Sequence, residues 1–310
     1  MNMINIAIIG ECMVELQKSE HGLTQAVGGD TLNTALYLTR LTQARNVRTS
    51  YVTALGDDPF SEDMIQNWNH EGIDTSLICR VSGKQPGIYY IETDNTGERT
   101  FHYWRSDSAA KYLFDQDETP QLIDRLMTFD AVYLSGITLA ILTANGKEVL
   151  FNFLAAFKAK GGKVFFDNNY RPKLWPNQAE AISWYLKTLH LTDTALLTFD
   201  DEQLLFGDMN VEQCIERTRE AGVSEIIIKR GGEACLVVQD QSAEFVAPKP
   251  VSNIVDTTAA GDSFSAGFLA RRFTGGNAIE SASFGHQLAG NVIQHQGAII
   301  PKQFTPELPQ

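Results

Sequence analysis

Short runs of apolar, β-branched residues alternate along the chain with longer segments of helical periodicity. Each run is continuous and stops at Gly, Asp or Asn, which is typical of strands buried on both faces of a parallel sheet. We expect such strands within residues 4–10, 130–136, 162–169, 194–202 and 224–232. The apolar spacing of residues 145–161 predicts a helix between two of them. This alternation predicts a doubly wound, mostly parallel α/β sheet.

One region departs from this alternation. Residues 76–105 hold several strand-like runs with no helix between them, and the TDNTGE stretch at residues 93–98 is a hairpin signal. We therefore predict a single α/β domain over residues 1–310, with a small antiparallel β lid inserted at about residues 76–105.

Composition and charge exclude several classes of protein. The net charge of −13 argues against nucleic-acid binding and against attraction to an anionic membrane, because both need a basic surface. The N-terminal residues lack a basic region and are typical of a buried strand, not of a signal peptide. The four cysteines form no CxxC pair, so we expect reduced thiols and a cytoplasmic protein.

The segment D-T-T-A-A-G-D, residues 256–262, places small residues between two acidic ones at the start of a helical pattern. Ala259, Ala260 and Gly261 let their backbone N–H groups approach a ligand, and the N-terminus of a helix attracts an anion. Asp262 would repel a phosphate there, unless its carboxylate accepts a proton from the nucleophile that attacks the phosphate. The alternative is a helix-capping Asp next to residues chosen for packing.

A glycine pair also precedes an early helical pattern. Gly28 and Gly29 allow close backbone approach to a ligand, and Asn33 has an amide that can hydrogen-bond ligand hydroxyl groups. The alternative is an ordinary helix start with Asp30 as its cap.

A second glycine pair follows a predicted strand. Lys229 ends the strand, and Gly231 and Gly232 form a turn of a kind that can hold a nucleotide phosphate. The alternative is a simple turn between two strands. The P-loop pattern G-x-x-x-x-G-K-[ST] is absent from the sequence.

Two arginines favour an anionic ligand. Asp167, Asn169 and Arg171 alternate after a strand, which puts them on one face if the chain stays extended, although a surface loop is the alternative. On the small sheet, Tyr103 and Arg105 share a face. A Tyr/Arg face suits a substrate with hydroxyl groups and a carboxylate, and the alternative is a half-exposed aromatic face.

In this order along the whole chain, the segments resemble the ribokinase-like (PfkB) family of carbohydrate kinases. The segment at residues 256–262 is similar to the family signature D-T-x-G-A-G-D. The resemblance implies that Asp262 is the catalytic base, and that backbone N–H groups of Gly261, Ala260 and Ala259 hold the transferred phosphoryl group. Ala259 stands where the family pattern has glycine, and alanine disfavours positive φ.

The resemblance also implies ATP and Mg²⁺ as cofactors. It implies a nucleotide site formed by Asn169, Lys229, Gly231, Gly232, Thr257, Ala259, Ala260 and Gly261. It implies a substrate site formed by Gly28, Gly29, Asp30, Asn33, Tyr89, Tyr103, Arg105, Asn169, Arg171 and Asp262. The metal ligands stay unassigned, although Asp200, Asp201 and Glu202 form an acidic cluster that can hold hydrated magnesium. The sequence leaves open whether a monovalent cation binds near Asp256.

Within the family, the lid and the segment around Arg171 are most similar to 2-keto-3-deoxygluconate kinases. This implies that ATP phosphorylates the terminal hydroxyl of this sugar acid, giving 2-keto-3-deoxy-6-phosphogluconate and ADP. Two arginines also favour a sugar acid over a neutral hexose, because a desolvated guanidinium left unpaired costs about 1–3 kcal/mol or more. The alternatives are a kinase of a neutral sugar such as fructose, or a non-catalytic sugar-binding sensor. Exposed aromatic residues such as Trp104 favour a homo-oligomer.

Overall fold

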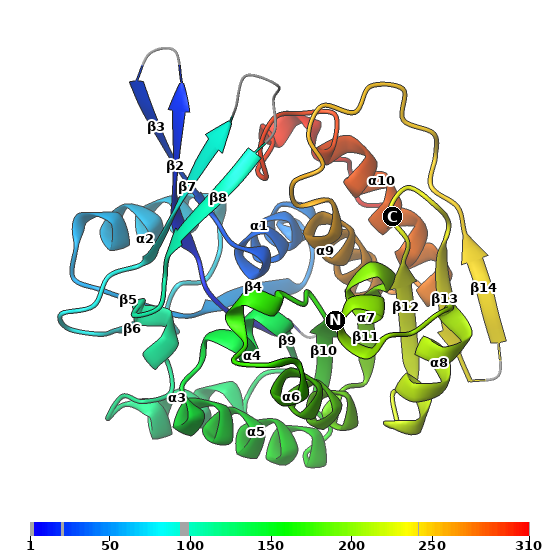
Figure 1. Cartoon of the computed structure of the whole chain (residues 1–310), viewed down its shortest axis with the longest axis horizontal. Coiled ribbons are helices and arrows are strands. Elements are labelled where there is room, and N and C mark those ends of the chain that lie inside the picture. The colour runs from blue at the N-terminus through cyan, green and yellow to red at the C-terminus, as the bar shows by residue number, and fades with distance from the viewer. Residues whose placement is uncertain (1–2, 20–21, 94–98, 241, 310) are drawn as a thin grey trace.

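The computed structural model describes residues 3–19, 22–93, 99–240 and 242–309 (Figure 1). Its main sheet has the strand order β4-β1-β9-β10-β11-β12-β13-β14. The strands from β4 to β12 run parallel, and β13 and β14 continue the sheet as antiparallel strands. The strands are β1 (Ile4–Ile9), β4 (Val47–Val52), β9 (Ala131–Ser135), β10 (Lys163–Asp167), β11 (Thr194–Thr198), β12 (Glu225–Lys229), β13 (Cys235–Gln239) and β14 (Ser242–Val246). The predicted doubly wound, mostly parallel sheet is confirmed.

Helices cover both faces of this sheet. One face packs against α1 (Asp30–Thr42), α2 (Pro59–Glu71), α9 (Ala260–Phe273) and α10 (Ala278–Val292). The other packs against α3 (Thr119–Leu126), α4 (Gly136–Ile141), α5 (Ala144–Ala159), α6 (Gln178–Leu191), α7 (Phe199–Phe206) and α8 (Val211–Glu220). In β1, Ile6 and Ile8 enter the first core and Ala7 and Ile9 the second, because successive side chains of a strand point to opposite faces. Burial on both faces explains why β1 is apolar from Ile6 to Ile9.

A separate small sheet projects from the main body (Figure 1). Its order is β3 (Gly22–Gly28), β2 (Met13–Ser19), β7 (Gly87–Thr93) and β8 (Arg99–Trp104). The outer pairs are antiparallel, and the central pair β2–β7 is parallel. The predicted hairpin turn lies almost entirely on residues 94–98, outside the described residues.

The predicted boundaries of the lid were too narrow. Two of its strands, β2 and β3, come from residues before α1, and β6 (Cys79–Arg80) pairs instead with β5 (Ala54–Leu55). Hydrophobic alternation does not mark β3, because all its residues but the last two are exposed. That the chain forms one domain stays a prediction. Short 3₁₀ helices lie at Ala109–Tyr112, Pro172–Leu174 and Lys302–Phe304.

The connections place the switch point of the sheet between β1 and β9. The chain passes from β1 to β4 on one side, then returns to β9 on the other side. In open α/β sheets, ligands bind beyond the carboxyl ends of the strands at such a point. No helix in the described part of the chain is long and apolar enough to cross a membrane.

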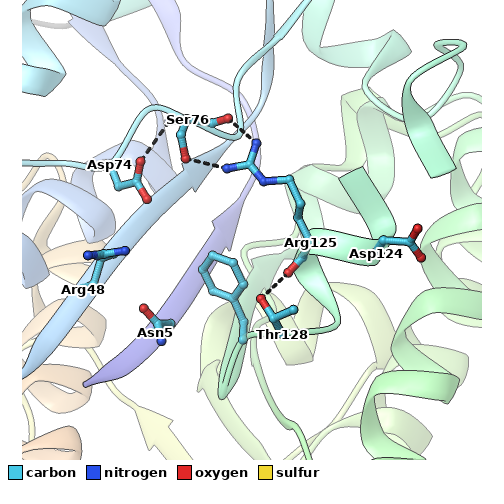
Figure 2. Close-up of a pocket in the computed structure, with 8 residues that line it drawn as sticks. Asn5, Arg48, Asp74, Ser76, Asp124, Arg125 and Thr128 are labelled. Carbon is cyan, nitrogen blue, oxygen red and sulfur yellow. Dashed lines mark hydrogen bonds between the residues drawn. The ribbon is translucent and has the colours of Figure 1, made fainter. Parts of the chain in front are cut away.

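A surface hollow of 460 Å³ lies at the opposite, amino-terminal edge of the sheet (Figure 2). Asn5 and Arg48, each the second residue of its strand, line it together with Arg125. Figure 2 shows Arg125 reaching Ser76, to which its guanidinium donates two hydrogen bonds of 2.7 Å. This hollow is remote from the carboxyl ends of the strands, where ligands bind in open α/β sheets.

Candidate active site

The bare turn at residues 256–262 has a strained backbone at its centre. Ala259 has φ 59° and ψ 18°, the left-handed region that alanine disfavours by about 1–2 kcal/mol. The helix α9 begins at the next residue, and no side chain caps it, so the capping role considered for Asp262 is wrong. The turn is therefore held in an unfavourable conformation without the help of a cap, as is common at functional sites.

The first turn of α9 offers two backbone donors. The N–H of Ala260 already donates to the carbonyl of Thr257 at 3.2 Å, and that of Ser263 to Ala259 at 2.9 Å. The N–H groups of Gly261 and Asp262 have no acceptor within the residues that the structure describes. Unpaired N–H groups at a helix N-terminus form an anion site. The site thus rests on Gly261 and Asp262 more than on Ala260.

Asp262 is half-buried in the middle of this site. Its Oδ2 accepts a hydrogen bond of 2.8 Å from Nδ2 of Asn33, one turn into α1. Burial and the neighbouring carboxylate of Asp30 raise the pKa of Asp262 to about 7, and the bond from Asn33 and the charge of Lys229 oppose this rise. A carboxyl group with a pKa near neutrality is suited to act as a general base.

Asp30 and Asn169 complete the floor of the site. Asp30 is the first residue of α1 but makes no capping bond, so the second capping alternative is also wrong. Its Oδ2 accepts a hydrogen bond of 2.7 Å from Nδ2 of Asn169. The pKa of Asp30 is raised, chiefly by burial, although a hydrogen bond from Ser135 opposes the rise. The first turns of α1 and α9 therefore bring the carboxyl groups of Asp30 and Asp262 together.

A buried ion pair lies below these carboxyl groups. Lys229 Nζ is 2.7 Å from Oδ2 of Asp167, which also accepts bonds from Ser265 at 2.8 Å and Tyr133 at 3.3 Å. A Cβ built on Gly261 would lie 3.7 Å from Lys229 Nζ. Lys229 thus lies beside the anion turn, and its ammonium does not extend into the Gly231–Gly232 turn that follows it in the sequence.

The turn formed by Gly231 and Gly232 is open. A Cβ on either glycine would meet no atom within 4 Å in the described structure. Gly231 has φ 57°, a conformation that favours glycine. The space beside this turn is therefore open, and the nucleotide phosphate stays a prediction.

The glycines before α1 make room for protein atoms. A Cβ on Gly28 would lie 2.3 Å from the hydroxyl of Tyr89, and one on Gly29 would lie 2.2 Å from the carbonyl oxygen of Glu11. The sequence predicts that these glycines let a ligand approach the backbone. Their observed neighbours are instead a lid side chain and the end of β1.

Tyr89 and Tyr103 lie opposite each other on the neighbouring lid strands β7 and β8. The rings of Tyr89 and Tyr103 are 5.9 Å apart, and the hydroxyl of buried Tyr89 donates to Glu15. Arg105 directly follows β8, and its buried guanidinium donates to Glu11. Of the two predicted lid side chains, Tyr103 is therefore exposed, whereas Arg105 is held in an ion pair with Glu11.

Arg171 does not lie where the sequence predicted. Asn169 has φ 27°, so the chain is not extended there and the expected alternation is broken. Asp167 and Asn169 reach the carboxylate cluster, but Arg171 is 52% exposed and its Nη1 lies 3.3 Å from Asp201. The structure therefore places only one of the two predicted arginines, Arg105, in a buried position.

The three acidic residues after β11, Asp200, Asp201 and Glu202, lie in different surroundings. Glu202 is buried and accepts bonds from Asn168 and from Arg217, which also pairs with Asp208. Glu202, Asp208 and Cys214 lie close enough for a metal, but Arg217 occupies the carboxylates of this group. Asp200 and Asp201 are the two members of the predicted cluster that lie outside this buried pairing.

The carboxylate of Asp256 accepts hydrogen bonds from two neighbouring segments of the chain. A monovalent cation near this residue stays a prediction. Oδ1 of Asp256 accepts from the backbone and hydroxyl of Thr258 at 3.0 and 2.7 Å. Its Oδ2 accepts from Gln296 at 3.0 Å and from the backbone of Gly297 at 2.9 Å. The carboxylate therefore joins the turn before α9 to the segment after α10.

A family model described as pfkB family carbohydrate kinase matches residues 3–304. The chain belongs to the pfkB family of carbohydrate kinases. The resemblance inferred from the motifs is confirmed, as is the prediction of an enzyme. The structures also agree: this pfkB chain superposes on 2-dehydro-3-deoxygluconokinase from Thermotoga maritima with a TM-score of 0.83 at 20% identity, covering 96% of this chain and 95% of that one. A fructokinase from Xylella fastidiosa with bound ATP gives 0.82 at 22% identity, covering 98% and 95%.

Relatives in the pfkB family at 42–50% identity share the name 2-dehydro-3-deoxygluconokinase. The chain is 50% identical to the 2-dehydro-3-deoxygluconokinase of Dickeya dadantii, over 97% of this chain and 98% of the relative. It is 48% identical to the protein of the same name from Escherichia coli K12, with the same coverage. A fructokinase from Vibrio alginolyticus is 26% identical over 86% of this chain and 84% of that protein.

Sequence reasoning missed several residues of this pfkB site. Glu11, Ser265 and Tyr133 were not proposed, and Asp167 was seen only as part of an alternation. One signal was available for Glu11, because a charged residue just beyond a buried strand lies at the ligand-binding edge of the sheet. Ser265 and Tyr133 gave no comparable signal, since each lies within an apolar run.

Proposed function

We propose that the protein transfers the γ-phosphoryl group of ATP to the terminal hydroxyl of 2-dehydro-3-deoxygluconate, also called 2-keto-3-deoxygluconate. The observation that carries this proposal is Asp262, a carboxyl group with a pKa of about 7 beside the unpaired N–H groups of a helix N-terminus. The name shared by the relatives at 42–50% identity supports the choice of substrate.

The proposed reaction begins with a proton transfer to Asp262. Its carboxylate takes the proton of the sugar hydroxyl as that oxygen attacks the γ-phosphorus, and the bond from phosphorus to the bridging oxygen of ADP breaks in line. The N–H groups of Gly261 and Asp262 donate to the oxygens of the transferred group, and Lys229 contributes positive charge from below.

Magnesium that accompanies ATP supplies positive charge to the phosphate oxygens when it is bound. Asp200, outside the buried pairing with Arg217, would hold it through its water shell, whereas the carboxylate of Asp201 already pairs with Arg171. A monovalent cation near Asp256 remains a prediction.

The substrate is proposed to lie between the lid and the floor of the site. Asp30, Asn33 and Asn169 meet its hydroxyl groups, and Arg105 meets its carboxylate. Tyr103 covers it from the lid. Arg171 is left out of this proposal, because its guanidinium lies beside Asp201.

Release of ADP in the presence of 2-keto-3-deoxygluconate, fructose, ribose or gluconate tests the proposal. We expect kcat/KM for 2-keto-3-deoxygluconate to exceed that for fructose or ribose by about 100-fold or more, because these neutral sugars offer no carboxylate to the unpartnered Nε of Arg105. Preference for fructose would indicate a neutral-sugar kinase. Tight sugar binding without turnover would indicate a sensor.

The homo-oligomer is also part of the proposal. Leu23 and Trp104, both 62% exposed, lie on the two outer strands of the small sheet. Exposed apolar side chains on edge strands favour pairing with another sheet, and light scattering of Trp104→Lys beside the native protein tests this. The free cysteines, three of them buried, support the proposed cytoplasmic location.

A further inference from the structure

Glu11 is a buried carboxylate that the proposed reaction does not use. It lies two residues after β1, at the switch point of the main sheet, and is 2% exposed. Its Oε2 accepts a hydrogen bond from Nη2 of Arg105, and its Oε1 accepts one from the hydroxyl of Ser108. Both partners follow β8, so Glu11 joins the main sheet to the base of the lid.

The surrounding backbone is shaped to accommodate this pair. A Cβ on Gly87, the first residue of β7, would lie 3.0 Å from Cβ of Arg105 and 3.1 Å from Oε1 of Glu11. Gly29 gives the same room to the backbone of Glu11, as described above. Two elements of the small sheet and the start of α1 thus close around one ion pair.

The Nε–H group of Arg105 is a hydrogen-bond donor without an acceptor among the described residues. The Arg105 side chain is 9% exposed, and its Nε is buried. A buried donor without an acceptor is unfavourable, and an incoming acceptor relieves it. Arg105 is also near enough to lower the pKa of Asp30, although burial is the largest influence on that group. The guanidinium of Arg105 is therefore within electrostatic range of Asp30, on the floor of the proposed substrate site.

We propose that Glu11 is a positioning residue for substrate recognition. It holds Nη2 of Arg105, so that the guanidinium is fixed before the substrate arrives and Nε is presented to the substrate carboxylate. A fixed donor loses less freedom on binding than a mobile one. This inference rests on the proposed function, since it takes a sugar acid to be the substrate.

The first test is Glu11→Gln, which keeps the shape of the side chain but removes its charge. We expect the KM for 2-keto-3-deoxygluconate to rise about tenfold, with kcat and the KM for ATP nearly unchanged, because only the fixing of Arg105 is lost. The matched control is Glu92→Gln, since Glu92 is an exposed lid carboxylate paired with His102. This control should leave all three constants unchanged.

A double variant separates an action through Arg105 from a direct one. Arg105→Ala should raise the same KM, and adding Glu11→Gln to it should produce no further rise, because coupled residues are not additive. Additive effects, an unchanged KM or a lower KM in Glu11→Gln would each overturn the inference. If Glu11→Gln fails to fold, Ser108→Ala removes only one bond to Glu11 and should give a smaller rise in the same KM. An unchanged KM in that variant would then overturn it.

The outcome for the native enzyme separates the two proposals. If the native enzyme does not phosphorylate the sugar acid, the proposed function fails and this inference fails with it. If the native enzyme is active but Glu11→Gln has a native KM, only this inference fails.

Discussion

Asn33 donates a hydrogen bond of 2.8 Å to Asp262, although 229 positions separate the two residues in the chain. The other end of the same amide, Oδ1 of Asn33, is buried without a partner in the part of the chain that the structure describes. The amide therefore fixes the carboxylate with one end and leaves an acceptor for a substrate hydroxyl at the other. One side chain of α1 thus connects the proposed base to the proposed substrate.

Asp262→Asn should abolish proton transfer while keeping the shape of the site. We expect kcat to fall by about 10²–10⁴-fold, the usual contribution of a general base. ATP binding, measured by calorimetry, should stay within a small factor of the native value because the N–H donors of α9 remain. A variant that keeps more than a tenth of the native kcat would rule out Asp262 as the base.

The pKa of Asp262 predicts an acidic limb in the pH profile. The base must be ionised, so kcat/KM should fall tenfold per pH unit once the pH drops below about 7. Two substitutions should move this midpoint in opposite directions. Asn33→Ala removes a bond that lowers the pKa and should shift the midpoint to higher pH, whereas Asp30→Asn removes a charge that raises it and should shift the midpoint lower.

Profiles of kcat/KM from pH 5 to 9 check both shifts. Either variant will also lower the rate, because both residues lie on the floor of the site, but only the midpoint is diagnostic. Shifts of the same sign in the two variants would contradict the assignment of the limb to Asp262.

The main sheet was predictable because its strands are buried on both faces, as Ile6 and Ala7 illustrate on opposite sides of β1. The strands β2 and β3 were missed because few of their side chains enter the core. The position of the candidate site could be predicted at the bare turn before Asp262, where the local sequence is unusual, whereas the glycine pair before Asp30 has protein atoms as its neighbours. Pairing between distant segments was not predictable: Glu11 and Arg105 are 94 positions apart, and Asp167 and Lys229 are 62 apart.

The left-handed backbone at Ala259 predicts a substitution that helps stability. Ala259→Gly should raise the free energy of unfolding by up to about 1 kcal/mol, because glycine adopts this conformation without the penalty that alanine has. Ala266→Gly, in the interior of the same helix, should lower it by about 0.5–1 kcal/mol or more. Chemical denaturation of both variants measures the two signs. Loss of stability in Ala259→Gly would show that the turn is not strained.

The contact between Gly28 and Tyr89 predicts that Tyr89→Phe restores sugar binding lost in Gly28→Ala. Gly28→Ala places a Cβ where the hydroxyl of Tyr89 lies, so the lid strand must shift and we expect the KM for the sugar to rise about tenfold. Adding Tyr89→Phe removes that hydroxyl and should restore most of the loss, even though the bond to Glu15 is given up. Gly29→Ala is the matched control, since its neighbour is the backbone carbonyl of Glu11 and no side-chain change relieves the overlap. If Tyr89→Phe rescues both variants, or neither, the hydroxyl is not the atom that requires glycine at position 28.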